Sequence, residues 1–174
     1  MLLGRRVLIV LSMVVLVALA IGVVGAVSAS PDDEKDNNKK SRTLTVATKT
    51  PEIKVVDLGP QGPTQGDAIV QNAPLYNATG KERIGRFDLF CAVTDPADES
   101  AEKAHMAECT KTFTLPGGEI SVQGREAYPD ELSARPTPGE DAITGGTGKY
   151  AGVRGEQRFE PRRTKGINTF HFIG

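Results

Sequence analysis

The sequence predicts an all-β domain folded as a barrel or a sandwich, and three observations lead to that prediction. Apolar residues recur at every second position from Leu44 onward, as they do on half-buried strands. The chain contains 19 glycines and 11 prolines, which favour short elements joined by tight turns. No stretch of ten residues after the N-terminal apolar run has helical spacing.

The N-terminus has the layout of a secretory signal. Arg5 and Arg6 precede an almost purely apolar run over residues 7–27, and small residues follow as far as Ala29. We expect cleavage after Ala29. The run is also about as long as the roughly 20 residues that span a bilayer, so residues 1–29 are a signal peptide or an N-terminal membrane anchor. In both cases the rest of the chain is expected to be secreted or extracytoplasmic, because the basic flank stays inside.

Residues 30–43 are polar and charged, and they contain no apolar side chain that could be buried. Such a segment cannot offset the entropy cost of ordering, so we expect a flexible polar linker before a folded domain over residues 44–174. The net charge is -1, and no basic block lies outside the leader and linker. Nucleic acid is therefore not expected as a partner, and a membrane is expected to be contacted only through the N-terminal segment.

The clearest strand covers Ile84–Thr94, where one face is apolar apart from a glycine and is expected to point inward. Glu108–Leu115 shows the same alternation, with Lys111 as the exception. Pro116-Gly117-Gly118 then predicts a tight turn into a strand over Glu119–Gly124. Further strands are expected at Thr43–Ala47, Glu52–Leu58, Gly66–Tyr76, Asp141–Thr144, Gly152–Phe159 and Asn168–Ile173. Helix formers between Pro96 and Met106 leave room for a single helical turn.

Two cysteines, Cys91 and Cys109, lie on neighbouring predicted strands. In an exported chain an even count favours a disulfide, and two free buried thiols are the alternative. No metal site is expected, because only these cysteines and two distant histidines are available. One of them, His105, is expected in a solvated, charged loop, and the other, His171, in the last strand.

Asp57 is the acid with the most chemical interest. It closes an apolar strand just before Leu58-Gly59-Pro60. A carboxylate at the mouth of a barrel can have a raised pKa and act as an acid or base. The alternative is an aspartate that only initiates a turn.

The glycine-rich segment Gly145–Tyr150 is a turn rather than a phosphate loop. Ile143 stands where the first glycine of a phosphate loop belongs, and Tyr150 replaces the Ser or Thr after Lys149. No helical pattern follows that could hold an anion. We therefore expect no nucleotide and no other cofactor.

Several segments, in the same order along the chain, resemble the allene oxide cyclase and dirigent β-barrel families. They cover roughly residues 53–173 and comprise Gly66-Asp67, Leu75-Tyr76-Asn77, Arg83-Ile84-Gly85, Gly118–Gly124, Ala142–Gly148 with Tyr150 and Gly152, and Thr169–Phe172. The resemblance implies an eight-stranded antiparallel barrel, usually a homotrimer, whose interior binds an apolar or aromatic small molecule. In the cyclases such a barrel steers the ring closure of a fatty-acid epoxide, and in dirigent proteins it steers radical coupling.

The resemblance also assigns residues to the cavity. Cys91 matches a family cysteine that faces the cavity, and Phe87 and Leu89 share its face, where the family has smaller residues. The family glutamate of the first strand is matched at best by Asp57. The segment Leu58–Gln65 is shorter than the polar loop of the plant cyclases.

Three functions are consistent with these residues. The first is an exported barrel that binds an apolar small molecule and steers its cyclisation or coupling. The second is a true cyclase or isomerase, without a cofactor, in which Asp57 is the acid or base. The third is a structural cell-envelope module with a filled barrel. Cavity volume separates them, because a ligand site requires about 300 Å³.

Overall fold

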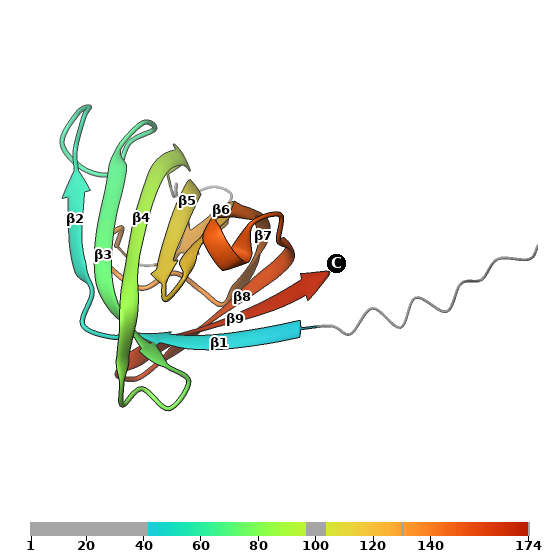
Figure 1. The fold of residues 1–174 in the computed structure, drawn as a ribbon. Helices are drawn as coiled ribbons and strands as arrows, with labels where there is room; N and C mark the ends of the chain where they lie inside the picture. Colours follow the sequence, from blue (N-terminus) through green and yellow to red (C-terminus); the bar gives the residue numbers. More distant parts are fainter. Residues whose placement is uncertain (1–41, 97–103, 130, 174) are drawn as a thin grey trace, which may run out of the picture. The chain divides into compact units, whose positions relative to one another are not determined.

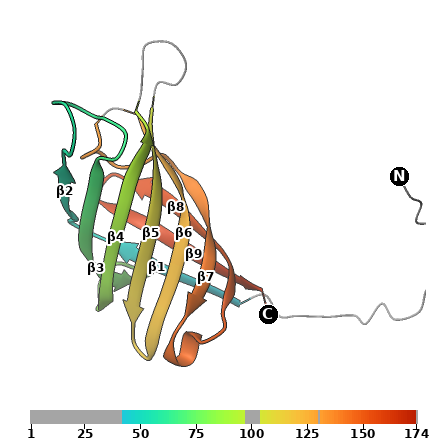
Figure 2. The same cartoon turned by 90° about the horizontal axis from the view of Figure 1, so that it is seen from above.

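The folded domain is an antiparallel β-barrel, as predicted (Figures 1 and 2). The computed structural model describes residues 42–96, 104–129 and 131–173. The predicted signal peptide or anchor and nearly all of the predicted linker lie outside these residues. Among the described residues, no helix is long and apolar enough to span a membrane.

The described residues of the domain form nine strands and one short 3-10 helix. The strands are β1 (Arg42–Thr48), β2 (Glu52–Val56), β3 (Ala68–Asn77), β4 (Arg83–Asp95), β5 (His105–Leu115), β6 (Gly118–Tyr128), β7 (Gly139–Gly146), β8 (Arg154–Arg162) and β9 (Lys165–Ile173), with the 3-10 helix η1 at Gly148–Tyr150. The sheet runs in the order β1-β9-β8-β7-β6-β5-β4-β3-β2, and β1 also pairs with β3. This extra pairing closes a ring of eight strands.

The first strand of the barrel is broken into two pieces. β1 pairs with Leu75–Asn77 at one end of β3, and β2 pairs with Ala68–Asn72 at the other end. Between the two pieces, Thr50 adopts a left-handed backbone conformation with φ 46°. The break at this residue lets β1 continue the ring toward β9, while β2 lies beside β3 only. β1 begins at Arg42, within the range expected to be linker.

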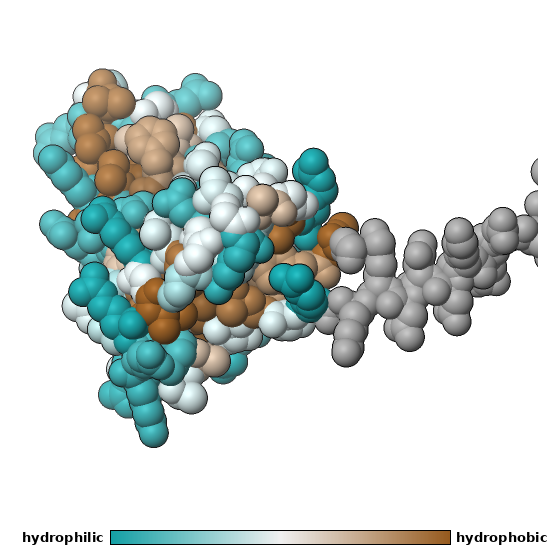
Figure 3. Space-filling view, in the orientation of Figure 1, coloured by the Kyte–Doolittle hydropathy of each residue, from teal (hydrophilic) through white to brown (hydrophobic). Residues whose placement is uncertain are grey.

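The alternation predicted on β4 is confirmed. Phe87, Leu89, Cys91 and Val93 are buried, whereas the intervening Phe90 is 55% exposed on the outer face. Apolar surface also gathers at the upper left of Figure 3, where Figure 1 draws the β2–β3 loop and the upper ends of these strands. Val70 and Phe90, which are register partners on β3 and β4, are both exposed on this outer face.

Aromatic rings fill one end of the barrel. Phe113 on β5 lies 4.9 Å from Phe87 and 4.9 Å from Phe170, measured between ring centroids, and Phe170 stacks on Phe172 at 6.1 Å. The β5–β6 hairpin closes this end through a two-residue turn, in which Gly117 has a φ of 92° that favours glycine. η1 lies against the hairpin, since the Lys149 amide donates to the Gly117 carbonyl.

The start of β5 differs from the sequence-based expectation. β5 begins at His105 rather than Glu108, and His105 is only 9% exposed, so the prediction of a solvated histidine was wrong. The reason is that the inward alternation of β5 continues back through Ala107 to His105. Met106 belongs to this strand, and residues 97–103, the rest of the segment with helix formers, lie outside the described residues.

Candidate functional site

Lys111 interrupts the apolar lining of β5, and the structure explains why it is tolerated. Its side chain points into the barrel and is 3% exposed. The ammonium forms ion pairs with Glu126 on β6 and with Asp141 on β7, the second at 2.5 Å. Both carboxylates are themselves buried. Three neighbouring strands therefore each contribute one charged group to a cluster inside the barrel, where a charge must be paired to be stable.

A glycine makes room for this cluster. Gly124 occupies the inward position of β6 between Val122 and Glu126. A Cβ atom on residue 124 would lie 1.7 Å from Oδ1 of Asp141. The glycine that ends the segment Gly118–Gly124 is therefore what lets the Asp141 carboxylate reach across to Lys111.

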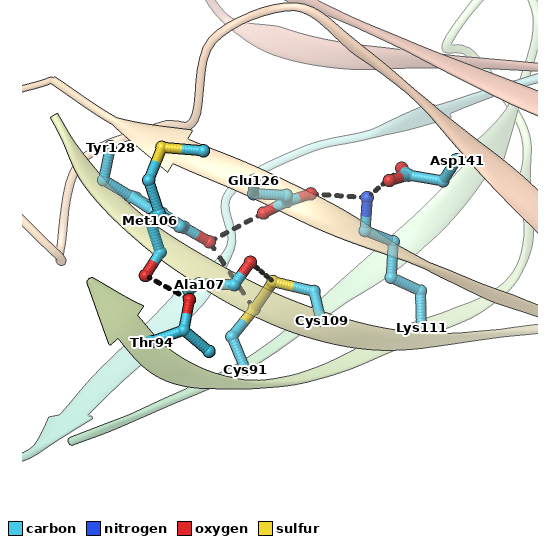
Figure 4. Close-up of a disulfide and its surroundings, with 9 residues drawn as sticks. All are labelled: Cys91, Thr94, Met106, Ala107, Cys109, Lys111, Glu126, Tyr128 and Asp141. Carbon is cyan, nitrogen blue, oxygen red and sulfur yellow. Dashed lines mark hydrogen bonds and ion pairs between the residues drawn. A yellow bond between two sulfur atoms is a disulfide. The ribbon is translucent and has the colours of Figure 1, made fainter. Parts of the chain in front are cut away.

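Tyr128 extends the cluster toward the two sulfur atoms. Its hydroxyl donates to Oε2 of Glu126 at 2.7 Å and lies 3.7 Å from Sγ of Cys91 (Figure 4). A continuous line of contacts thus runs from the disulfide through Tyr128 and Glu126 to Lys111 and Asp141.

The predicted disulfide between Cys91 and Cys109 is present. The two residues are direct partners in the β4–β5 register, with their Cα atoms 4.1 Å apart. Both are buried. Because Cys91 is in the bridge, it offers no thiol to the interior.

The protonation of the cluster follows from its surroundings. Burial disfavours the charged form of Lys111, but the negative charges of Glu126 and Asp141 outweigh it and raise the pKa of the ammonium. Burial, followed by the charge of Glu126, raises the pKa of Tyr128 far above its ordinary value of 10.0. At neutral pH, Lys111 is therefore a cation and Tyr128 a neutral hydrogen-bond donor.

A second polar pair lies on the next two strands. Nε2 of Gln157 on β8 donates to Oδ1 of Asn168 on β9 at 3.1 Å. Gln157 is the register partner of Asp141 across β7 and β8. We call the charged cluster of Lys111, Glu126 and Asp141, together with Gln157 and Asn168, the polar belt. Both amide side chains are buried.

The polar belt borders a small cavity that lies between Phe87 of the aromatic cluster and the β6–β7 loop. Its volume is about 30 Å³, which is room for about one water molecule. The lining contains Phe87, Leu89, Lys111, Glu126 and Asn168 from the barrel, together with Thr48, Pro51, Ile53, Gln71, Ala134, Arg135, Pro136, Phe159 and Gly166. Two of the three residues predicted to line a cavity, Phe87 and Leu89, are at its surface, while Cys91 is held in the disulfide.

The β6–β7 loop covers this cavity. Its residues 134–136 form part of the lining, and Leu132 is inserted into the core with 4% exposure. The guanidinium of Arg135 donates to the carbonyl of Arg162, next to the β8–β9 turn, and the Thr137 amide donates to the Ala127 carbonyl at 2.9 Å. We call residues 131–138 the covering loop.

Asp57 lies away from the charged cluster. It is exposed, and its carboxylate accepts hydrogen bonds from the amides of Gly59 and Gly62, both at 3.3 Å. It borders an open hollow of about 500 Å³ between the β2–β3 loop and the covering loop. This geometry is that of a residue organising a turn.

Asp67 is the buried acid of the β2–β3 loop. It accepts hydrogen bonds from the amides of Leu58 and Thr64 at 2.9 and 2.7 Å, and these donors lower the pKa of its carboxyl. The carboxylate therefore joins both ends of the loop to the start of β3.

Sequence reasoning missed the charged cluster. The available signals were Lys111 itself, as an exception within an apolar face, and the alternation of β6, which continues beyond Gly124 to place Glu126 and Tyr128 inward. Asp141 carried no signal of its own.

No protein-family model matches the sequence, and no curated protein matches it. Solved structures do. Pyocyanin demethylase matches with a TM-score of 0.61 and 26% identity, over 76% of this chain and 100% of that chain. A nonspecific heme-binding cyclase, which catalyses a cycloaddition during neoabyssomicin biosynthesis, matches with a TM-score of 0.56 and 14% identity, over 76% of this chain and 65% of its own.

The Diels Alderase AbmU from Streptomyces koyangensis matches with a TM-score of 0.55 and 14% identity, over 78% of this chain and 71% of its own. These proteins are named for reactions other than those of the allene oxide cyclase and dirigent families that the sequence motifs resemble. The chain therefore has the β-barrel fold of a group of proteins that includes cyclases and Diels-Alderases.

Proposed function

We propose that this barrel binds a small organic molecule with an apolar ring system and a polar end, and that it promotes a cyclisation or related rearrangement of that molecule. The observation that carries the proposal is the chain of buried polar groups from Tyr128 through Glu126 to Lys111, part of which forms the wall of an end cavity. The apolar side chains of Phe87 and Leu89 face the same cavity. The cavity is therefore lined by apolar side chains on one side and by the charged groups of Lys111 and Glu126, which we call the charged floor, on another.

A purely structural barrel would gain little from such a floor. Replacing a buried ion pair by apolar residues of similar volume is often neutral or stabilising, because desolvation of the charges is costly. The retention of three buried charges beside a cavity therefore favours a binding site over a filled envelope module.

Each group of the floor has a chemical role in this proposal. Lys111 has three N–H donors, and two of them face Glu126 and Asp141. The third can stabilise negative charge that develops on a ligand oxygen. Glu126 is the proton acceptor nearest the cavity, and Tyr128 holds its second oxygen in place. The walls fix the reactive conformer, which is the main requirement of a cyclisation.

Ligand entry requires movement of the covering loop. A cavity of about 30 Å³ is far below the roughly 300 Å³ that a drug-sized ligand occupies. Among the described residues, the main-chain hydrogen bond from Thr137 to Ala127 joins the covering loop to the barrel, and displacing residues 134–136 together with Leu132 would enlarge the site.

A matched pair of tryptophan variants tests the proposal. Leu89 and Phe90 are neighbours on β4 that point to opposite faces. We expect wild-type protein and Phe90→Trp to bind pyocyanin, chosen as probe because of the similarity to pyocyanin demethylase, and Leu89→Trp to bind at least tenfold more weakly because the indole fills the cavity. Equal affinity in all three proteins, each shown to be folded by its melting temperature, would contradict an interior site.

We further propose that the chain is exported through its N-terminal segment. The disulfide supports this, since disulfides persist in oxidising compartments. Cell fractionation combined with N-terminal sequencing of the mature protein tests export and cleavage after Ala29 together. Recovery of the protein in the cytoplasm would contradict the proposal. The homotrimer implied by the family resemblance stays a prediction that analytical ultracentrifugation can check.

A further inference from the structure

The amide pair of Gln157 and Asn168 has unused hydrogen-bonding groups inside the barrel. Nε2 of Gln157 donates a hydrogen bond to Oδ1 of Asn168. Oε1 of Gln157 and Nδ2 of Asn168 have no hydrogen-bond partner among the described residues. Gln157 is 0% exposed and Asn168 is 2% exposed. Each primary amide carries an acceptor oxygen and an NH2 group with two donors, so the single hydrogen bond between these two residues leaves the oxygen of Gln157 and the NH2 group of Asn168 unused.

One residue of this pair lines the end cavity. Asn168 is at the cavity surface together with Lys111 and Glu126, and Gln157, which is not part of the lining, is hydrogen-bonded to Asn168. Buried polar atoms without partners are rare in native proteins, because each one costs stability. A pair of them, one donor and one acceptor, beside a cavity indicates a place where a ligand supplies the missing partners.

We infer that Gln157 and Asn168 form a subsite for a neutral ligand edge that carries an acceptor and a donor side by side, as in a primary carboxamide or a lactam. The inference rests on the proposed function, and it specifies the polar end of the ligand. The donor of the edge bonds to Gln157 and its acceptor to Asn168. A carboxylate fits less well, because it has no donor for Gln157 and would add a third negative charge beside Glu126 and Asp141.

The test compares ligands that share one ring system. Phenazine is the parent ring of pyocyanin, and phenazine-1-carboxamide adds the donor and acceptor edge. We expect wild-type protein to bind the carboxamide roughly tenfold more tightly than phenazine, and more tightly than phenazine-1-carboxylate, in calorimetric titrations. The double variant Gln157→Leu/Asn168→Leu is expected to bind carboxamide and phenazine equally.

A matched control lies on the same two strands. Glu156 and His171 are register partners on β8 and β9, and both are exposed on the outer face. Glu156→Leu/His171→Leu is expected to keep the full preference for the carboxamide. A wild-type protein without that preference, or a Gln157→Leu/Asn168→Leu variant that retains it, overturns the inference.

Thermal melting of the ligand-free proteins gives a second readout. If the amide pair serves a ligand, Gln157→Leu/Asn168→Leu removes two unpaired polar atoms and melts at or above the wild-type temperature. If the pair is structural, the variant melts several degrees below both wild type and the outer-face control, and the inference is overturned. Failure of wild-type protein to bind any of the three phenazines counts against the proposed function, and melting alone then decides the inference.

Discussion

The two halves of the barrel interior are built on different principles. Toward the β5–β6 hairpin, the rings of Phe87, Phe113 and Phe170 pack against one another. Toward the covering loop, Lys111 and Asp141 meet as charges in the same closed space. The aromatic half gains stability from burial, whereas the polar half gains little, because desolvation of charges offsets their attraction. The difference fits our proposal that the first half maintains the fold and the second binds a ligand.

Truncating the aromatic half is expected to have one of the two largest effects. Phe113 is fully buried and contacts two other rings, so Phe113→Ala should reduce the free energy of unfolding by about 3–5 kcal/mol. Urea denaturation monitored by circular dichroism measures it. A loss below about 1 kcal/mol would show that this half is not the stable part of the interior.

Breaking the charged cluster should be costly, but replacing it whole should not. Lys111→Met leaves Glu126 and Asp141 facing each other unpaired, and is expected to cost about 3–5 kcal/mol. The triple variant Lys111→Met/Glu126→Leu/Asp141→Leu is expected to recover most of that loss. If the triple variant is as unstable as the single one, the cluster is structural and the contrast between the halves fails.

Removing the disulfide should have an intermediate effect. Cys91 and Cys109 are 18 positions apart in the sequence, and closing a loop of that size contributes about 3 kcal/mol in the chain-entropy model. The variant Cys91→Ala/Cys109→Ala should therefore unfold at a lower urea concentration. Because the bridge lies 3.7 Å from the hydroxyl of Tyr128, we also expect weaker ligand binding. Unchanged affinity would separate the bridge from the site.

Alkaline pH should weaken the polar half selectively. The pKa of Lys111 is raised in the folded protein, so its contribution is complete below its ordinary value of 10.5 and is lost as the pH rises through the folded value. Tyr128 keeps its proton in the fold, whereas an unfolded tyrosine ionises above pH 10.0, so the unfolded state gains there too. Wild-type stability should thus fall above about pH 10.

The control for this pH dependence adds Tyr128→Phe to the triple variant of the charged cluster. Its urea midpoint, measured from pH 8 to pH 11, should fall less steeply than that of wild type, because both titrating groups are gone. Parallel curves for the two proteins would assign the alkaline sensitivity to other residues.

The smallest effect is expected at Asp57. It is exposed and accepts two long hydrogen bonds within its own turn, so Asp57→Asn should change the unfolding free energy by less than about 0.5 kcal/mol. Asp67→Asn should cost more, because Asp67 is buried and receives two shorter amide hydrogen bonds. If Asp57→Asn abolishes ligand binding or turnover, the active site lies in the open hollow beside Asp57 and not in the barrel interior.

The fold could be predicted from the sequence to a greater degree than the site. Alternation along β4 and the turn at Gly117 are local properties, and both are found in the structure. The site depends on which inward residues of different strands share one level of the barrel. That level is set by register, so Lys111 and Asp141, which are 30 residues apart, could not be paired from spacing alone. Asp57 was predicted as an acid or base because it closes an apolar strand just before a Gly-Pro turn, which is a local pattern.

Gly124 makes two positions of this chain interdependent. A larger residue there would occupy the space that the Asp141 carboxylate now fills, so alanine at 124 is tolerated only if residue 141 shrinks or turns away. In a library that randomises both positions, functional clones should therefore show a paired preference, with glycine accompanying aspartate. We expect the same coupling in other barrels of this fold. They should have either glycine at the position of Gly124 together with an acid at the position of Asp141, or apolar side chains at both positions.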